Sequence, residues 1–174
     1  AQEYLLGEIQ IFGEGFVPVT SYRSVILSLD EPVNFGRIHW NFEKFSAVDS
    51  ESEALSDPDA PVNLILETRT GRDDSPTVYT LLNEIGAEEI VDMTTFQRAP
   101  EPSIRLGARP GDKESIQDDL DNWSPWSTPY RASGELLRSP DGREFLQLQF
   151  RIESEDHLSY GRLDSILIEY SPCS

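Results

Sequence analysis

The chain has 174 residues, and its 32 acidic side chains outnumber its 14 lysines and arginines, giving a formal net charge of −18 at pH 7. This excess of negative charge excludes ordinary nucleic-acid binding, which depends on neutralising phosphates with Lys and Arg, and it argues against docking on anionic lipid. No apolar run approaches the length of a transmembrane helix, and the hydrophobic share of 37% is typical of a folded domain.

Alternation of apolar and polar residues, the period of a β-strand, dominates the chain. In chain order, strands are predicted over residues 4–17, 24–29, 36–45, 62–70, 77–82, 144–154 and 163–170. The clearest pattern is in the sixth of these strands, where Leu146, Leu148 and Phe150 alternate with polar residues. This pattern predicts that one face of the strand lies in the core.

Helix is weakly indicated, and only a short helical turn within residues 81–93 is considered. Most of the 12 prolines and 11 glycines lie between the predicted strands. Two polar stretches, residues 46–60 and 100–122, predict long exposed loops. We therefore expect an all-β fold, an antiparallel β-sandwich of the jelly-roll type with two long loops and little helix. The length predicts that residues 1–174 form a single domain.

No catalytic motif is recognisable in the sequence. The two histidines, His39 and His157, lie in a predicted strand and in an acidic turn, and the chain contains no G-x-S-x-G, H-E-x-x-H or C-x-x-C motif. Pairs of carboxylates such as glycoside hydrolases use abound in so acidic a chain, so their presence carries little information. A hydrolase with carboxylate catalysis is therefore the third of the functions considered.

Five acidic residues crowd into a short stretch within the second predicted loop: Asp112, Glu114, Asp118, Asp119 and Asp121. Hard oxygen ligands close together in sequence suit Ca²⁺, which takes six to eight oxygens. The spacing is not that of an EF-hand, and a solvated acidic loop is the alternative that we favour. Calcium is the one cofactor that the sequence raises.

The most specific feature is an aromatic segment, residues 122–130, which contains Trp123, Trp126 and Tyr130. These rings could form a platform on which sugar rings stack. The alternative, which we favour, is that they cover one end of the core, because each aromatic side chain buries a large apolar area.

The chain ends give two further expectations. Cys173 is the only cysteine, so an internal disulfide is excluded. The first residues, Ala1-Gln2-Glu3-Tyr4, have no initiator methionine and look like the product of signal-peptide cleavage. We therefore expect an exported protein that is periplasmic or extracellular.

Several stretches, taken together, resemble a known family. Residues 65–76 carry an R-T-G turn, residues 122–127 a W-S-x-W-S segment, residues 138–151 an S-P turn leading into a strand, and residues 162–166 an L-D-S strand. The combination resembles the discoidin-like, galactose-binding-like jelly-roll modules of bacterial exported proteins, over about residues 20–171. The resemblance implies a β-sandwich and a binding or assembly module that is usually part of a longer protein. It assigns no ligand residue.

The expected function is a non-catalytic, extracytoplasmic binding domain that acts as an accessory or stabilising subunit of a larger protein assembly, a membrane complex included. Its acidity would direct it toward a basic partner surface. The alternative is a carbohydrate-binding module that uses Trp123, Trp126 and Tyr130.

Overall fold

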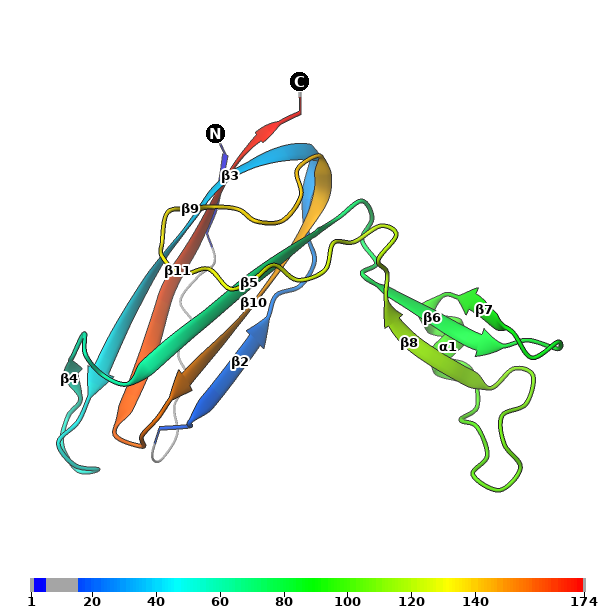
Figure 1. Ribbon diagram of the computed structural model, residues 1–174, viewed down its shortest axis with the longest axis horizontal. Helices are drawn as coiled ribbons and strands as arrows, with labels where there is room; N and C mark the ends of the chain where they lie inside the picture. Colours follow the sequence, from blue (N-terminus) through cyan, green and yellow to red (C-terminus); the bar gives the residue numbers. More distant parts are fainter. Residues whose placement is uncertain (1, 6–15, 174) are drawn as a thin grey trace. The chain divides into compact units, whose positions relative to one another are not determined.

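The computed structural model describes residues 2–5 and 16–173 of the chain. These residues form two antiparallel β-sheets with one short helix (Figure 1). They divide into two compact units: unit 1 comprises Ala1–Arg72 and Ser124–Ser174, and unit 2 comprises Asp73–Trp123. The prediction of a mostly β, antiparallel chain with little helix is confirmed. Whether the two units make a single domain stays a prediction.

Unit 1 contains the larger sheet, with eight strands in the order β1-β11-β3-β10-β2, while β5 pairs with β10, and β4 and β9 pair with β3. Its strands are β1 (Gln2–Leu5), β2 (Val19–Arg23), β3 (Leu27–Ser46), β4 (Leu55–Ser56), β5 (Val62–Gly71), β9 (Glu135–Leu136), β10 (Arg143–Ser154) and β11 (Ser159–Pro172).

Strand β3 takes part in two sets of pairings along its length. Its first residues pair with β10, where Leu27 is opposite Leu146. Val33 pairs with both β10 and β11, and from Asn34 to Ser46 the partner is β11. Asp30 lies in the first part with a positive φ of 66°, an uncommon conformation that Asp tolerates better than most residues. The strand is therefore shared between β10 and β11.

The core of unit 1 lies against one face of β10, where Leu146, Leu148 and Phe150 are buried, as the alternation predicts. Side chains from β3, β5 and β11 complete this cluster, among them Ile38 and Leu66. Fully burying such an aliphatic or aromatic side chain stabilises the fold by roughly 1.5–3 kcal/mol. The polar residues that alternate with these side chains lie on the opposite face of β10.

Unit 2 is a three-stranded sheet in the order β7-β6-β8, with one short helix. The elements are β6 (Thr77–Leu82), β7 (Glu88–Val91), α1 (Met93–Arg98) and β8 (Lys113–Asp118). Phe96 of α1 is buried, and its ring centroid lies 5.2 Å from that of Tyr79 on β6. Nowhere in residues 2–5 and 16–173 is there a helix with the length and hydrophobicity needed to span a membrane.

In unit 2 the structure differs from the sequence prediction at two places. Residues 81–93, considered for a helical turn, form the end of β6, a turn and β7, and α1 begins at Met93. The helix begins there because the Asp92 carboxylate accepts a hydrogen bond from the Thr95 amide, a standard N-cap. Residues 100–122, predicted as a loop, contain the strand β8. This strand is missed because most of its residues are polar.

In unit 1 the strand boundaries also differ from the prediction. Residues 27–29 and 36–45, predicted as parts of two strands, belong to one continuous strand, β3, and residues 24–26 lie outside it. The strands β2, β4 and β9 are absent from the prediction, and β4 lies within residues 46–60, which are predicted as a loop. Of the strand predicted at 4–17, Tyr4 and Leu5 belong to β1, Phe16 and Val17 lie outside any strand, and residues 6–15 lie outside the described part.

Candidate functional site

The aromatic segment of the sequence, from Ser124 to Tyr130, runs along the edge of β5 that β10 does not occupy (Figure 1). The amides of Ser124, Ser127 and Tyr130 donate to the carbonyl oxygens of Thr70, Thr68 and Leu66, at 2.9, 2.8 and 3.0 Å. The donor amides are therefore three residues apart in the segment, whereas the carbonyl groups that accept from them are two residues apart in β5. This pairing satisfies carbonyl groups that an uncovered edge would leave open to other chains.

The two serines of this segment satisfy the amides of β5. Ser124 Oγ accepts a hydrogen bond from the Thr70 amide and Ser127 Oγ accepts one from the Thr68 amide, each at 3.1 Å. The prolines at positions 125 and 129 have no amide hydrogen, and they lie at positions where none is used. The W-S-x-W-S motif is thus explained by backbone pairing along a strand edge.

Trp126 contacts two arginines on the polar face of the sheet. The guanidinium carbon of Arg69 lies 4.5 Å from the Trp126 ring centroid and that of Arg23 lies 5.2 Å from it. Arg69 is only 3% exposed, and its Nε donates to Gln147 Oε1 at 2.9 Å. Cation–π contacts of this kind contribute from about 0.5 kcal/mol at exposed sites to about 2 kcal/mol when desolvated. Trp126 therefore has a structural role.

Beside Trp126, the polar face of β2, β10 and β5 contains a shallow hollow of about 510 Å³, here called the unit 1 hollow. Arg23 donates to Gln149 Oε1 through Nε and Nη2 at 3.1 and 2.9 Å, and Gln149 Nε2 donates to Glu67 Oε2 at 2.8 Å. The hollow is lined by Ser21, Tyr22, Arg23, Ile65, Glu67, Gln149, Phe150 and Arg151. Guanidinium, amide and carboxylate groups on one open face can make hydrogen bonds with a polar ligand.

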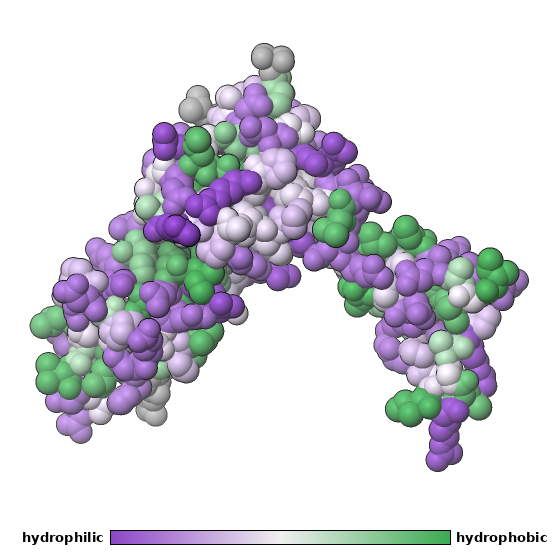
Figure 2. Space-filling model, in the orientation of Figure 1, coloured by the Kyte–Doolittle hydropathy of each residue, from purple (hydrophilic) through white to green (hydrophobic). Residues whose placement is uncertain are grey.

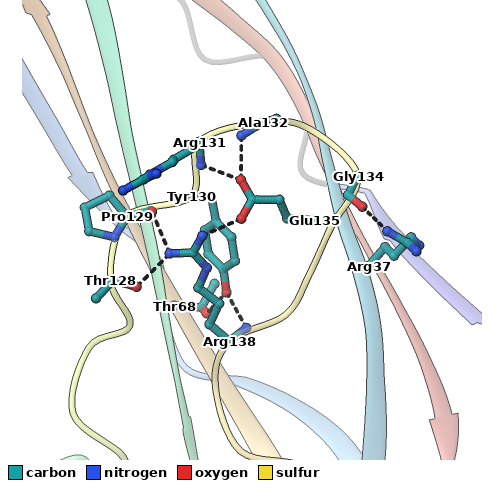
Figure 3. Close-up of polar contacts among 10 residues, drawn as sticks. All are labelled: Arg37, Thr68, Thr128, Pro129, Tyr130, Arg131, Ala132, Gly134, Glu135 and Arg138. Carbon is teal, nitrogen blue, oxygen red and sulfur yellow. Dashed lines mark hydrogen bonds and ion pairs between the residues drawn. The ribbon is translucent and has the colours of Figure 1, made fainter.

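Tyr130 points into unit 1 and is 4% exposed (Figure 3). Its hydroxyl lies 2.6 Å from Thr68 Oγ1 and accepts a hydrogen bond from the Arg138 amide at 3.0 Å. The Thr68 hydroxyl also contacts Ser139 Oγ at 2.7 Å. Tyr130 thus anchors the segment to the core, and its buried ring offers no free face to a sugar.

Glu135 and Arg138 fix the loop that follows Tyr130 (Figure 3). Glu135 Oε1 accepts from the amides of Arg131 and Ala132, each at 2.7 Å, and Oε2 accepts from Arg138 Nη2 at 2.5 Å. The hydrogen bonds from Arg131 and Ala132, and then from Arg138, hold the pKa of Glu135 below its ordinary value. Charge and hydrogen bonding thus connect both ends of this loop to one carboxylate.

Trp123, the last residue of unit 2, is 1% exposed, and its Nε1 donates to Asp73 Oδ1 at 3.0 Å. Of the three predicted sugar-stacking residues, Trp123 and Tyr130 are therefore buried, and Trp126 is partly exposed but contacts arginine. Carbohydrate binding stays a prediction, and within this set Trp126 is the residue that could take part.

The five predicted calcium ligands are spread along and around β8. Asp112 is buried and its Oδ2 accepts from the Arg109 amide at 2.8 Å. Asp119 accepts from the amides of Asp121 and Asn122, so it shapes a turn. Glu114 and Asp118 lie within β8. Across the described ranges, 2–5 and 16–173, no group of three or more His, Cys, Asp or Glu side chains is placed to hold a metal ion. Calcium binding stays a prediction.

The histidine of the predicted strand, His39, pairs with an acid on the outer face of β3 and β11. His39 Nε2 lies 2.9 Å from Glu169 Oε1. This hydrogen bond is the main cause that lowers the pKa of Glu169, and the Arg37 amide adds to it. His157 is exposed in the turn between β10 and β11. His39 is thus a residue of a strand and His157 a residue of a turn, as the sequence predicts.

Unit 2 has a feature that the sequence reasoning missed, a set of large apolar side chains that are exposed to solvent. Figure 2 shows hydrophobic residues at the surface in this part of the chain. The large apolar side chains of unit 2 that are exposed are Ile85, Ile90, Met93, Ile104, Leu106, Ile116 and Leu120. Large apolar side chains that are exposed to solvent are a feature of interaction surfaces. All seven lie outside the strands that the alternation predicted, and four of them, Ile85, Ile90, Met93 and Leu120, directly follow an acidic residue.

No family model matches the chain, and neither a curated protein nor a solved structure matches it. The discoidin-like resemblance therefore stays a prediction that rests on the sequence motifs.

Proposed function

We propose that the protein is a non-catalytic, extracytoplasmic binding domain that serves as an accessory or stabilising subunit of a larger protein assembly. In this proposal unit 1 is a discoidin-like, jelly-roll β-sandwich that provides a rigid scaffold, and unit 2 provides the surface that binds the partner. The observation that carries the proposal is the set of exposed apolar side chains in unit 2.

Charge supports a protein partner with a basic surface. Asp and Glu outnumber Lys and Arg in unit 2, as they do in the whole chain. A protein surface that combines apolar groups with acidic neighbours attracts a basic partner during encounter and then buries apolar area on contact. Nucleic acid and anionic lipid are disfavoured by the same charge.

The experiment is to isolate the native protein from gently crosslinked cells of its source and to measure the size of the species that contains it. We expect a complex larger than the free chain. A double variant of unit 2, Ile90→Ser with Ile116→Ser, is expected to release the free chain. The matched control is Val25→Ser with Val48→Ser in unit 1, which are similarly exposed and are expected to leave the complex intact. Recovery of the wild type only as a free monomer would overturn the proposal.

Carbohydrate binding is the second candidate, and one observation favours it: Trp126 lies against Arg23, which lines the unit 1 hollow with Glu67 and Gln149. Sugar sites combine an aromatic side chain with such groups. A glycan array probed with the full chain tests it, and the expected binding should be lost on Gln149→Ala. Absence of binding to any glycan would dismiss this candidate. A hydrolase stays the third prediction.

A further inference from the structure

A second hollow lies wholly within unit 2, between the turn that joins β6 to β7 and the residues that precede β8. It has a volume of about 590 Å³ and is here called the unit 2 hollow. Its lining residues are Leu81, Leu82, Asn83, Glu84, Ile85, Glu89, Pro110 and Gly111. The hollow is thus lined by both apolar side chains and carboxylates.

One wall of the unit 2 hollow is a turn fixed by its own hydrogen bonds. Asn83 Oδ1 accepts from the amides of Ile85 and Ala87 at 3.1 and 2.9 Å, and the Asn83 amide donates to the Ala87 carbonyl at 2.9 Å. Gly86 completes the turn with a φ of 77°, a conformation that favours glycine. The backbone at Ile85 is therefore fixed by its amide hydrogen bond, while its side chain is 88% exposed. A turn that is already formed lowers the conformational entropy that is lost on binding.

The other wall is fixed to β6 through backbone hydrogen bonds. The Gly111 amide donates to the Leu82 carbonyl at 2.7 Å, and the Leu82 amide donates to the Asp112 carbonyl at 3.0 Å. The Asp112 carboxylate accepts from the Arg109 amide at 2.8 Å. Both walls are thus formed before any partner arrives, as is usual for binding sites.

The charges around the unit 2 hollow define its complement. Glu84 and Glu89 line it, Glu88 directly precedes Glu89 in β7, and no lysine or arginine is among its described lining residues. Arg109 is the neighbour of Pro110 in sequence. A carboxylate rim around apolar groups is complementary to an apolar side chain that has a basic residue next to it.

We propose that the unit 2 hollow docks a segment of the partner protein that carries a large apolar side chain flanked by Lys or Arg. This inference rests on the proposed function and names the part of unit 2 that provides specificity. The apolar side chain packs against Leu81, Leu82 and Ile85, and the basic neighbour pairs with Glu84 or Glu89.

The probe is a short fluorescein-labelled peptide of alternating leucine and lysine, titrated against the full chain by fluorescence anisotropy. Two matched peptides serve as controls, one of serine and lysine and one of leucine and glutamate. We expect the leucine–lysine peptide to bind at least about tenfold more tightly than either control, because only it supplies both groups. Absence of binding, or equal binding of the serine–lysine peptide, overturns the proposal.

Variants of the full chain locate the site. Ile85→Ser and Glu89→Lys are each expected to weaken the leucine–lysine peptide by about tenfold. The matched controls are Ile104→Ser, a fully exposed isoleucine outside the hollow, and Glu53→Lys in unit 1, and both are expected to change binding less than about twofold. Since all four positions are exposed, unchanged thermal melting should accompany every variant. Equal losses in Ile85→Ser and Ile104→Ser would show general stickiness and overturn the proposal.

The same variants separate this inference from the proposed function. If the wild type is in a complex in cells and Ile85→Ser is also in that complex, the hollow is not the docking site, although the binding function stands. If the wild type is never in a complex, the proposed function itself fails.

Discussion

The Thr68 hydroxyl is buried at the centre of unit 1, where it contacts the hydroxyls of Tyr130 and Ser139 at 2.6 and 2.7 Å. The three hydroxyls link β5, the aromatic segment and the turn before β10. Leaving a buried polar group without its partner lowers the free energy of unfolding by about 1–3 kcal/mol. The hydrogen bonds of Thr68 therefore stabilise unit 1 in addition to the packing of its side chain.

Thr68→Val keeps the shape of the side chain and removes the hydroxyl. We expect the free energy of unfolding to fall by about 1–3 kcal/mol, because the Tyr130 and Ser139 hydroxyls lose a buried partner. Urea denaturation followed by tryptophan fluorescence measures it. The same change at Thr20, in a partly exposed position of β2, should stay within about 0.5 kcal/mol. Equal effects at the two positions would contradict the role of Thr68.

Glu135 makes the stability of its loop depend on pH. Its pKa in the folded protein lies below the ordinary 4.5, because it accepts hydrogen bonds from the Arg131 and Ala132 amides and from Arg138. The unfolded chain therefore takes up the proton first as the pH falls. The stabilisation is fully present above the unfolded pKa and is lost as the pH falls through the folded pKa.

We accordingly expect Glu135→Gln to lower Tm at neutral pH and to flatten the fall of Tm below about pH 4.5. Differential scanning fluorimetry across this acid range measures both effects. Glu31→Gln at an exposed position of β3 is the control, and it should follow the wild type. A Glu135→Gln profile parallel to that of the wild type would show that this carboxylate does not contribute.

At the scale of elements, the segment from Ser124 to Tyr130 covers the free edge of β5 in a way unlike a normal strand. Its amides bond to every second residue of β5, and the amides of Thr68 and Thr70 are satisfied by serine side chains. The cover therefore depends on serine hydroxyls as well as on the backbone.

Ser124→Ala and Ser127→Ala are each expected to destabilise unit 1 by about 1–2 kcal/mol and to speed hydrogen exchange at one amide, Thr70 or Thr68 respectively. Hydrogen exchange followed by NMR resolves the two amides. Ser50→Ala in an exposed loop is the control and should alter neither amide. Uniform faster exchange over all of β5 would point to general loosening instead of loss of a specific acceptor.

The sequence predicts the strands whose alternation is strict and misses those whose residues are polar. Strand β10 was predicted almost to its ends because Leu146, Leu148 and Phe150 share one buried face. Strand β8 was missed because its solvent-exposed edge position tolerates charged residues. The helical turn was predicted at the wrong residues, because α1 has only six residues and is too short for a period of 3.6 residues to reveal it. The signal that marks its start is the Asp92 cap.

The candidate sites were less predictable than the strands. Trp123 and Tyr130 were considered for ligand stacking, but they are buried, because each polar atom found a partner within the fold: Asp73 for Trp123 and Thr68 for Tyr130. Those partners are distant in sequence. The unit 2 hollow depends on a turn at Asn83 and on residues before β8, which no single period brings together.

At the scale of the whole molecule, the chain connection shows how unit 2 is inserted. The first part of unit 1 ends at Arg72, one residue after the end of β5, and the second part begins at Ser124, whose amide bonds to the Thr70 carbonyl at 2.9 Å. The two ends of the insertion therefore lie next to each other on unit 1.

Replacing residues 73–123 by a short glycine–serine turn is expected to leave unit 1 folded, because the connection that must be closed is short. The far-UV circular dichroism should keep its β signal, and the Thr68 and Thr70 amides should keep their protection. The matched variant replaces residues 136–140, which run through the core contacts of Ser139, and should unfold unit 1. Loss of structure in both variants would mean that unit 1 depends on unit 2.

Strand β3 connects two parts of the sheet of unit 1 through its backbone hydrogen bonds. Because its first residues are bonded to β10 and its later ones to β11, neither neighbour can separate without releasing part of the same strand. Unit 1 should accordingly melt in one all-or-none transition, with calorimetric and van't Hoff enthalpies that agree. We therefore expect no partly opened form of unit 1 in which one half of its sheet persists while the other is lost.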